Sequence, residues 1–223
     1  MEMETSLTID TEETLRLTKA VVLDRPKVKA DIVVETLANL GVKAAFGIPG
    51  GAFYALFDAL TRAPSIEVIL AQHEGAAAYM AMGRSMAAKG REVGLCFATS
   101  GPGMTNLITG VASAYEERVP LFVLTGNVST KNIGKGAVQD GFSSGINSLE
   151  MFHPITVRSQ SVTDETDLIQ TVTQLYNFSL EEKKPVHLNL PINISIQKVD
   201  TQNAKEFVSQ HASTLDIPSF SQS

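Results

Sequence analysis

Apolar residues recur along most of this chain in blocks that alternate between helical and strand-like spacing. Positions 30, 33, 34, 37 and 40 follow the i, i+3, i+4, i+7 rule of a helix with one buried face, and residues 42–48 form a short apolar run typical of a buried strand. The alternation predicts helices at residues 30–40, 53–60, 76–89, 103–115 and 164–184. It predicts strands at residues 42–48, 68–70, 93–98, 121–125, 155–162 and 186–190.

Strands that alternate with helices predict an α/β fold, here a three-layer, open and mostly parallel sheet of about six strands with helices on both faces. Right-handed crossovers bring all strand-to-helix turns to one edge of such a sheet, where ligands bind. Four segments are expected at that edge: residues 49–51, Glu74, residues 99–103 and residues 126–151, the last as a long loop. Their convergence predicts a functional site.

The pattern fades at both ends of the chain. Residues 1–26 are expected to form an acidic N-terminal extension, in which residues 11–23 have a weak helical pattern. Residues 27–200 are expected to form the folded domain, and residues 201–223 a polar tail or linker.

Composition excludes several classes of partner. The net charge is −6, from 18 Lys and Arg against 24 Asp and Glu, with no long basic cluster, which argues against nucleic acid or an anionic membrane as a partner. No apolar run approaches the ~20 residues needed to span a bilayer. The start of the chain lacks the features of a targeting segment, so we expect a cytoplasmic protein. The single cysteine, Cys96, lies in an apolar strand pattern and is expected in the core.

A dinucleotide-binding loop is the first candidate for the chemistry, because Gly101 and Gly103 follow a strand and open a helix. The fingerprint requires a third Gly or Ala where Asn106 stands, and no acidic residue ends the next strand. A Walker phosphate-binding loop is also excluded, since no Gly-Lys-Ser/Thr sequence occurs.

Four motifs occur in an order and spacing that resemble a known family. They are Phe46-Gly47-Ile48-Pro49-Gly50-Gly51-Ala52, Gln72-His73-Glu74-Gly75-Ala76-Ala77, Thr99-Ser100-Gly101-Pro102-Gly103-Met104-Thr105-Asn106 and Val138-Gln139-Asp140. Together they resemble the pyrimidine-binding domain of thiamine-diphosphate enzymes, in particular that of acetolactate (acetohydroxyacid) synthases. The resemblance extends over about residues 27–200.

The resemblance implies a catalytic role for Glu74. In the family, a carboxyl group hydrogen-bonded to N1′ of the cofactor's pyrimidine favours the imino tautomer, whose 4′-nitrogen removes the C2 proton of the thiazolium ring. The protein must therefore hold one carboxylic acid in a dry, fixed position. Glu74 stands between an apolar strand and an Ala-rich helix, which suits this task. The alternative is an exposed acid favoured by the helix dipole.

The resemblance also implies roles for residues of the other motifs. Pro49, Gly50 and Gly51 would lie beside the thiazolium, and Thr99, Pro102 and Asn106 would line the pyrimidine. Gln139 would point at the substrate from the long loop. The alternatives are a plain strand–helix turn at residues 49–51 and helix capping by Asn106.

The histidines have no assigned role in the four motifs, and some positions depart from the family pattern. His73 is interpreted as a structural residue that neighbours the site, and His153, His187 and His211 as surface or packing residues. Near the substrate, the synthases usually carry an aromatic where Ile48 stands and Glu where Asp140 stands, and they tend to carry Lys after positions 155–156, where this chain has Val157-Arg158. These differences leave open which 2-oxoacid is used, and whether the reaction is decarboxylation or carboligation.

Family members hold the diphosphate through Mg²⁺ on a second domain with a Gly-Asp-Gly sequence, which is absent here. We therefore expect a pyrimidine-binding (α-type) subunit of a split enzyme, in a hetero-oligomer built on dimers, with the Mg²⁺ ligands on a separate diphosphate-binding subunit. One alternative is a non-catalytic interaction or regulatory homologue. The other is a fragment of a longer acetolactate synthase-like enzyme.

Overall fold

The computed structural model describes residues 26–141 and 147–199. Its centre is a six-stranded sheet in the order β2-β1-β3-β4-β6-β5, in which every neighbouring pair of strands is parallel. The strands are β1 (Ala44–Ile48), β2 (Glu67–Leu70), β3 (Gly94–Ala98), β4 (Leu121–Asn127), β5 (Arg158–Ser161) and β6 (Pro185–Pro191). The predicted fold class, an open parallel sheet of about six strands, is confirmed.

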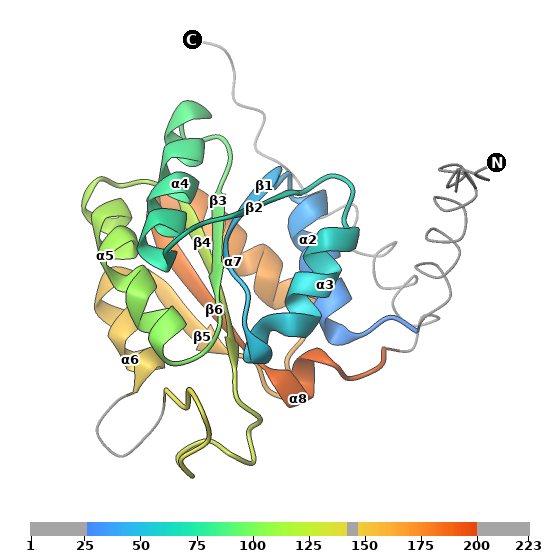
Figure 1. Ribbon diagram of the computed structural model, residues 1–223. Helices are drawn as coiled ribbons and strands as arrows, with labels where there is room; N and C mark the ends of the chain where they lie inside the picture. The colour runs from blue at the N-terminus through green and yellow to red at the C-terminus, as the bar shows by residue number, and fades with distance from the viewer. Residues whose placement is uncertain (1–25, 142–146, 200–223) are drawn as a thin grey trace, which may run out of the picture.

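Helices cover both faces of the sheet, so the molecule has three layers (Figure 1). One face is covered by α2 (Lys29–Asn39), α3 (Tyr54–Arg62) and α7 (Leu168–Glu182), which enclose the larger apolar cluster with β-strand residues. The other face is covered by α4 (Glu74–Ala87), α5 (Pro102–Glu116) and the short α6 (Ser148–Phe152). The remaining helical turns are η1 (Gly51–Phe53), η2 (His153–Ile155) and α8 (Ile192–Ser195).

The central strands are apolar because both of their faces are covered. Every residue of β3, β4 and β6 is buried, as expected for parallel strands between two helical layers. Cys96 in β3 is fully buried, and this burial raises the pKa of its thiol, so the expected core position is confirmed.

Several predicted boundaries are wrong. The strand expected at residues 155–162 is shorter, because residues 153–155 form η2 and pairing with β6 covers only Arg158–Ser161. The helix expected from residue 164 begins at Leu168, where the Asp167 carboxylate accepts a hydrogen bond from the Gln170 N–H at 3.0 Å and caps the first turn. The loop expected to reach residue 151 ends earlier, since α6 begins at Ser148.

The two ends of the described domain lie side by side. Val28 and Lys198 form an isolated antiparallel bridge, and the Val199 N–H donates to the Lys27 carbonyl at 2.8 Å. The domain boundaries near residues 27 and 200 stay predictions, and the expected helix at residues 11–23 and the expected tail at 201–223 lie outside the described residues. In the described part of the chain, no helix combines the length and apolar character needed to cross a membrane.

Candidate active site

The turns after β1 and β3 meet at the point where the strand order reverses. β1 and β3 are neighbours with Ile48 opposite Ala98, while β2 and β4 lie on their outer sides. The turn at residues 49–51 therefore lies beside the turn that begins at Thr99. Their contact is so close that a Cβ on Gly50 would lie 2.6 Å from the Cβ of Thr99. Ligands of open α/β sheets bind at this kind of reversal.

Glu74 and Asn106 form a hydrogen-bonded pair next to that reversal. Glu74 is the first residue of α4, and its Oε2 accepts a hydrogen bond from Asn106 Nδ2 at 3.0 Å. Glu74 is half-buried and Asn106 is exposed. The strand before Glu74, β2, is a partly exposed edge strand, so this chain alone gives Glu74 less cover than its apolar sequence setting suggests.

His73 holds the start of α4 in place. Its Nδ1 accepts a hydrogen bond from the Gly75 N–H at 3.0 Å, which makes His73 the N-cap of the helix. A ring nitrogen that accepts a hydrogen bond carries no proton, so a neutral His73 has its proton on Nε2. The interpretation of His73 as a neighbour of Glu74 fits this arrangement.

The close packing of α4 against α5 brings Glu74 and Asn106 together. Gly110 lies one helical turn after Asn106, and a Cβ on it would lie 2.5 Å from the Cβ of Ala78. The small residues of α4 let the two helices approach to this extent. This packing fixes the first turns of both helices relative to each other.

The turn after β3 contains two buried hydroxyl groups without a partner. Thr99 Oγ1 and Ser100 Oγ are buried, and neither has a hydrogen-bond partner in the structure. Gly101 follows with φ of 59°, a left-handed conformation that disfavours other residues, and Pro102 opens α5 with its ring exposed. Buried polar atoms without partners cost free energy and are rare in folded proteins, so these two hydroxyls require an explanation, and a functional role of the turn is one.

Gln139 reaches this turn through its backbone. A Cβ on Gly101 would lie 2.6 Å from the Gln139 carbonyl oxygen, so the two segments touch although they are far apart in sequence. Gln139 is exposed and has a left-handed φ of 60°. Its segment is braced by Asp140, whose Oδ2 accepts a hydrogen bond from the Gly134 N–H at 2.7 Å.

The sequence does not indicate the burial of the Ser100 hydroxyl or the hydrogen bonds of His187. A serine in a turn is ordinary, so only the burial of the Ser100 hydroxyl without a hydrogen-bond partner draws attention to it. His187, interpreted as a surface or packing residue, is fully buried and hydrogen-bonded at both ring nitrogens. Its position inside the apolar run at residues 186–190 was the available signal for burial.

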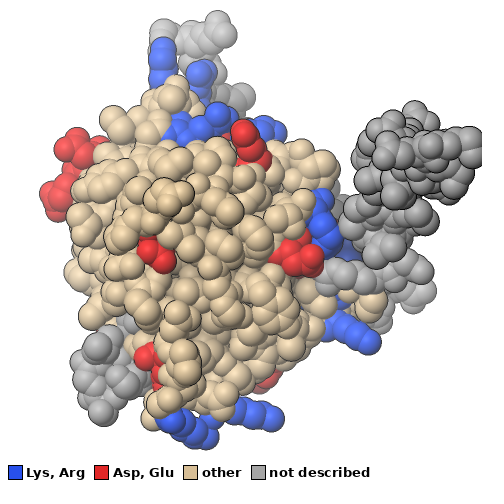
Figure 2. All heavy atoms as spheres, viewed as in Figure 1, with Lys and Arg blue, Asp and Glu red and all other residues tan. Residues whose placement is uncertain are grey.

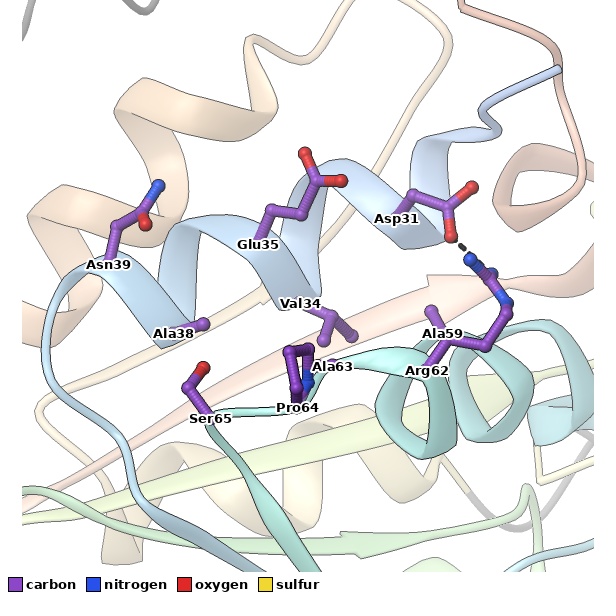
Figure 3. A pocket seen from close by; sticks show the side chains of 10 residues that line it. All are labelled: Asp31, Val34, Glu35, Ala38, Asn39, Ala59, Arg62, Ala63, Pro64 and Ser65. Atoms are coloured by element: carbon purple, nitrogen blue, oxygen red, sulfur yellow. Dashed lines mark hydrogen bonds and ion pairs between the residues drawn. The ribbon is translucent and has the colours of Figure 1, made fainter. Parts of the chain in front are cut away.

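A hollow of the described surface lies elsewhere, between α2 and α3 (Figure 3). It has a volume of about 350 Å³, and its lining includes Arg62 and the turn at residues 63–65. This turn precedes β2, whereas Glu74 follows the other end of that strand. An ion pair between Arg62 and the buried Asp31 lies along its wall. Nothing in its lining connects it with the predicted chemistry.

Comparison with known proteins identifies the family. The family model "Thiamine pyrophosphate enzyme, N-terminal TPP binding domain" matches residues 28–150, more than half of the chain. The chain belongs to the thiamine pyrophosphate enzymes. The match includes all four motifs, and the family binds thiamine diphosphate, another name for thiamine pyrophosphate, through this domain.

Curated relatives of this thiamine pyrophosphate enzyme domain are acetolactate synthases. The chain is 38% identical over 186 residues to the acetolactate synthase large subunit of Lactococcus lactis subsp. lactis, covering 83% of this chain and 31% of that protein. It is 39% identical over 166 residues to the isozyme 3 large subunit of Escherichia coli, covering 74% and 28%. It is 35% identical over 175 residues to the chloroplastic enzyme of Arabidopsis thaliana, covering 78% and 25%. The chain thus spans between a quarter and a third of the length of these relatives.

The residues at the reversal of strand order fit the pyrimidine half of thiamine diphosphate. That ring is flat and uncharged with polar edges, and the site offers a carboxyl group, an amide and two hydroxyls without partners. Beside them, Gly51 leaves open space, since no atom lies within 4 Å of the position that a Cβ on it would take. Among the described residues, no three His, Cys, Asp or Glu side chains are grouped as metal ligands.

Proposed function

We propose that this chain is the pyrimidine-binding (α-type) subunit of a split thiamine-diphosphate-dependent enzyme that acts on 2-oxoacids, either a decarboxylase or an acetolactate synthase-like carboligase. The observation that carries the proposal is the Glu74–Asn106 pair beside the β1–β3 reversal. The similarity to acetolactate synthase large subunits supports the class of substrate.

In this proposal Glu74 exchanges a proton with the pyrimidine N1′. Asn106 donates to Oε2 and so fixes the orientation of the carboxyl group, which leaves Oε1 to share the proton. Thiamine diphosphate, when bound, supplies a thiazolium carbon that becomes nucleophilic after it loses its proton. Glu74 acts through the ring rather than on the substrate, so its effect is on activation of the cofactor.

The other predicted residues have binding roles in the proposal. Thr99 and Pro102 line one side of the pyrimidine, and Pro49, Gly50 and Gly51 leave space beside the reacting carbon. Gln139 donates or accepts a hydrogen bond at the substrate from its exposed position. A 2-oxoacid such as pyruvate presents both a carboxylate and a carbonyl oxygen for such a contact.

The outward face of α4 supports a second protein surface next to this site. Among its exposed residues, Tyr79, Met80 and Met86 are 47%, 39% and 55% exposed. Figure 2 shows that the surface in the region of α4 and α5 carries few charged side chains. A surface helix normally exposes polar residues, and an exposed apolar stripe marks an interaction site. A partner bound here would also cover the half-buried Glu74 and exclude water from it.

The proposed partner is a separate diphosphate-binding chain that carries the Mg²⁺ ligands. The complex would be a cytoplasmic hetero-oligomer built on dimers, with the active site between subunits. The relatives, three to four times longer than the matched region, contain further protein that such a partner would replace. The same length also suits a piece of a longer synthase, in which the cover would come from the same polypeptide.

The test is turnover by the chain purified together with the diphosphate-binding chain from its source. With thiamine diphosphate, Mg²⁺ and pyruvate, the complex should consume pyruvate. Glu74→Gln should lower the rate by at least about a hundredfold, the usual size of a lost acid–base contribution. Glu116→Gln, the same change at the far end of α5, should leave the rate unchanged.

The outcomes separate the alternatives. Full activity of Glu74→Gln contradicts the catalytic assignment. A stable complex without any turnover favours the non-catalytic homologue, and a longer transcript that encodes both domains favours the fragment.

A further inference from the structure

A set of buried polar side chains crosses the sheet beneath α6. This polar network consists of Asn127 and Thr125 on β4, His187 and Asn189 on β6, and Ser159 and Ser161 on β5. The four members on β4 and β6 are 0% exposed. Buried polar groups cost free energy unless they are hydrogen-bonded, and apolar side chains could fill the same space without that condition. The network is therefore a candidate for a role beyond packing.

The direction of its hydrogen bonds follows from two carbonyl oxygens, which can only accept. At one end, Ser159 Oγ donates to the Leu149 carbonyl and therefore accepts from His187 Nδ1 at 2.9 Å, so the proton of a neutral His187 is on Nδ1. Its Nε2 then accepts from Thr125 Oγ1 at 2.8 Å. At the other end, Asn189 Nδ2 donates to the Gly126 carbonyl at 3.3 Å and to Thr125 Oγ1 at 2.9 Å. Burial, the main cause, lowers the pKa of His187 to about 3, in agreement with the neutral form.

One end of the network holds the start of the segment that carries Gln139. Asn127 Nδ2 donates to Asn189 Oδ1 at 3.3 Å, and Asn127 Oδ1 accepts a hydrogen bond from the Val128 N–H at 2.8 Å. Val128 is the first residue after β4. The side chain of Asn127 thus links Asn189 to the first residue of this segment, which comprises residues 128–141.

The other end of the network holds α6, the helix that follows the segment in sequence. The ring of Phe152 stacks on His187 with 4.0 Å between ring centroids. Ser159 Oγ donates to the Leu149 carbonyl at 3.4 Å. Phe152 and Leu149 both belong to α6, so His187 contacts this helix directly and through Ser159.

We propose that His187 and Asn189 are positioning residues that hold the Gln139 segment against the turn at residues 99–103. They do so by tying the strand before the segment and the helix after it to one buried network. Gln139 lies against Gly101 by its backbone, so its placement depends on the path of the segment between these two anchors. The inference rests on the proposed function only in taking Gln139 to face the substrate.

The test is hydrogen–deuterium exchange of the 223-residue chain without cofactor or partner. His187→Leu keeps an apolar contact with Phe152 and removes both ring hydrogen bonds. Backbone amides in residues 128–141 should then exchange at least about tenfold faster, while those in β1 and β3 change no more than global stability requires. Val172→Ala, a buried change in α7 on the opposite face of the sheet, is the matched control for a general loss of stability.

Equal acceleration of residues 128–141 in His187→Leu and Val172→Ala overturns the proposal, because the network would then act only on global stability. If His187→Leu does not fold, Ser159→Ala cuts the network on the half-buried edge strand and leaves His187 in place. This variant should accelerate exchange in residues 128–141 by about threefold relative to β1. No acceleration there contradicts the proposal.

A second readout separates this inference from the proposed function. In the active complex, Ser159→Ala should raise the KM for pyruvate several-fold and leave kcat within about twofold, because only the substrate contact is displaced. The exchange result requires no activity, so it stands if the proposed reaction is wrong. An active complex with an unchanged KM and unchanged exchange overturns the positioning role alone.

Discussion

The two helical layers of the sheet differ in the size of the residues they bury and in what they expose. On the α2, α3 and α7 side, large side chains fill the core, and Phe53 stacks on Phe97 with ring centroids 4.9 Å apart. The outer surface there carries ion pairs such as Lys27–Glu35. On the α4 and α5 side the core is rich in alanine, and the outer surface of α4 exposes Tyr79 and Met86. The first layer stabilises the domain through its larger core, and the second combines closely packed helices with exposed apolar side chains.

The largest effect should come from the α2, α3 and α7 side of the sheet, which we call the large-residue layer. Phe97→Ala removes a fully buried ring that stacks on Phe53 and contacts Phe57. The change should lower the free energy of unfolding by about 3–5 kcal/mol, because transfer and cavity costs add. Urea unfolding followed by circular dichroism measures it. A loss below about 1 kcal/mol would contradict the assignment of this layer as the main source of stability.

The next effect is a loss of stability on acidification. It belongs to the α4 and α5 side of the sheet, which we call the small-residue layer. The folded-state pKa of His187, about 3, lies below its usual 6.5, so the unfolded chain binds the proton first. The contribution of neutral His187 to the free energy of unfolding is therefore complete above about pH 6.5 and is lost as pH falls from there toward 3. Between pH 7 and pH 5 this loss should be about 2 kcal/mol. Burial is the main cause, and the charge of His153 adds to it.

Unfolding free energies of the wild type and His187→Leu, measured at both pH values, isolate the effect. Carboxyl groups titrate alike in the two proteins, so the difference reports His187. Parallel pH profiles would show that the imidazole is not held neutral.

A smaller effect on stability should distinguish alanine substitutions at two glycines of the small-residue layer. Gly110→Ala places a Cβ 2.5 Å from that of Ala78 and should cost about 1–2 kcal/mol, after the gain of about 1 kcal/mol in helix propensity. Gly83→Ala in α4 meets no atom within 4 Å and should instead stabilise the chain by up to about 1 kcal/mol. Thermal unfolding of both variants gives the comparison. Equal shifts of the two Tm values would show that α4 and α5 are not in tight contact.

The smallest effect on stability should come from the outer surface of α4. Met86→Lys should change the free energy of unfolding by no more than about 0.5 kcal/mol, because the side chain is 55% exposed. It should nevertheless weaken association with the diphosphate-binding partner by at least about tenfold. Asn177→Lys on α7 adds the same charge to an exposed position of the other layer and should leave association unchanged. Calorimetric titration of the two variants decides between these expectations.

The fold and the location of the site could be predicted because they follow from local patterns. Alternating periodicity determines which segments are strands and helices, and parallel pairing then brings Glu74, residues 99–103 and residues 49–51 to one edge. The pairing of Glu74 with Asn106 required in addition the close contact of α4 and α5, for which the alanine-rich sequence of α4 was the only signal.

Other features depend on tertiary contacts and could not be predicted. The exposure of β2 follows from its place at the edge of the sheet, which its apolar sequence does not reveal. The partners of His187 come from two other strands, so no local pattern of β6 indicates them. The late start of α7 reflects the cap at Asp167, since residues 163–166 instead form a turn in which Thr166 Oγ1 accepts a hydrogen bond from the Thr163 N–H.

The strand order has a consequence for synthesis of the chain. Among the described strands, β6 is the last to leave the ribosome, yet it lies between β4 and β5 and carries His187 and Asn189. Until it inserts, β5 has no neighbouring strand and the Gln139 segment lacks its buried anchors. Parallel pairing between distant segments is slow to form. The Gln139 segment therefore gains these anchors only after β6 has been translated and has inserted into the sheet.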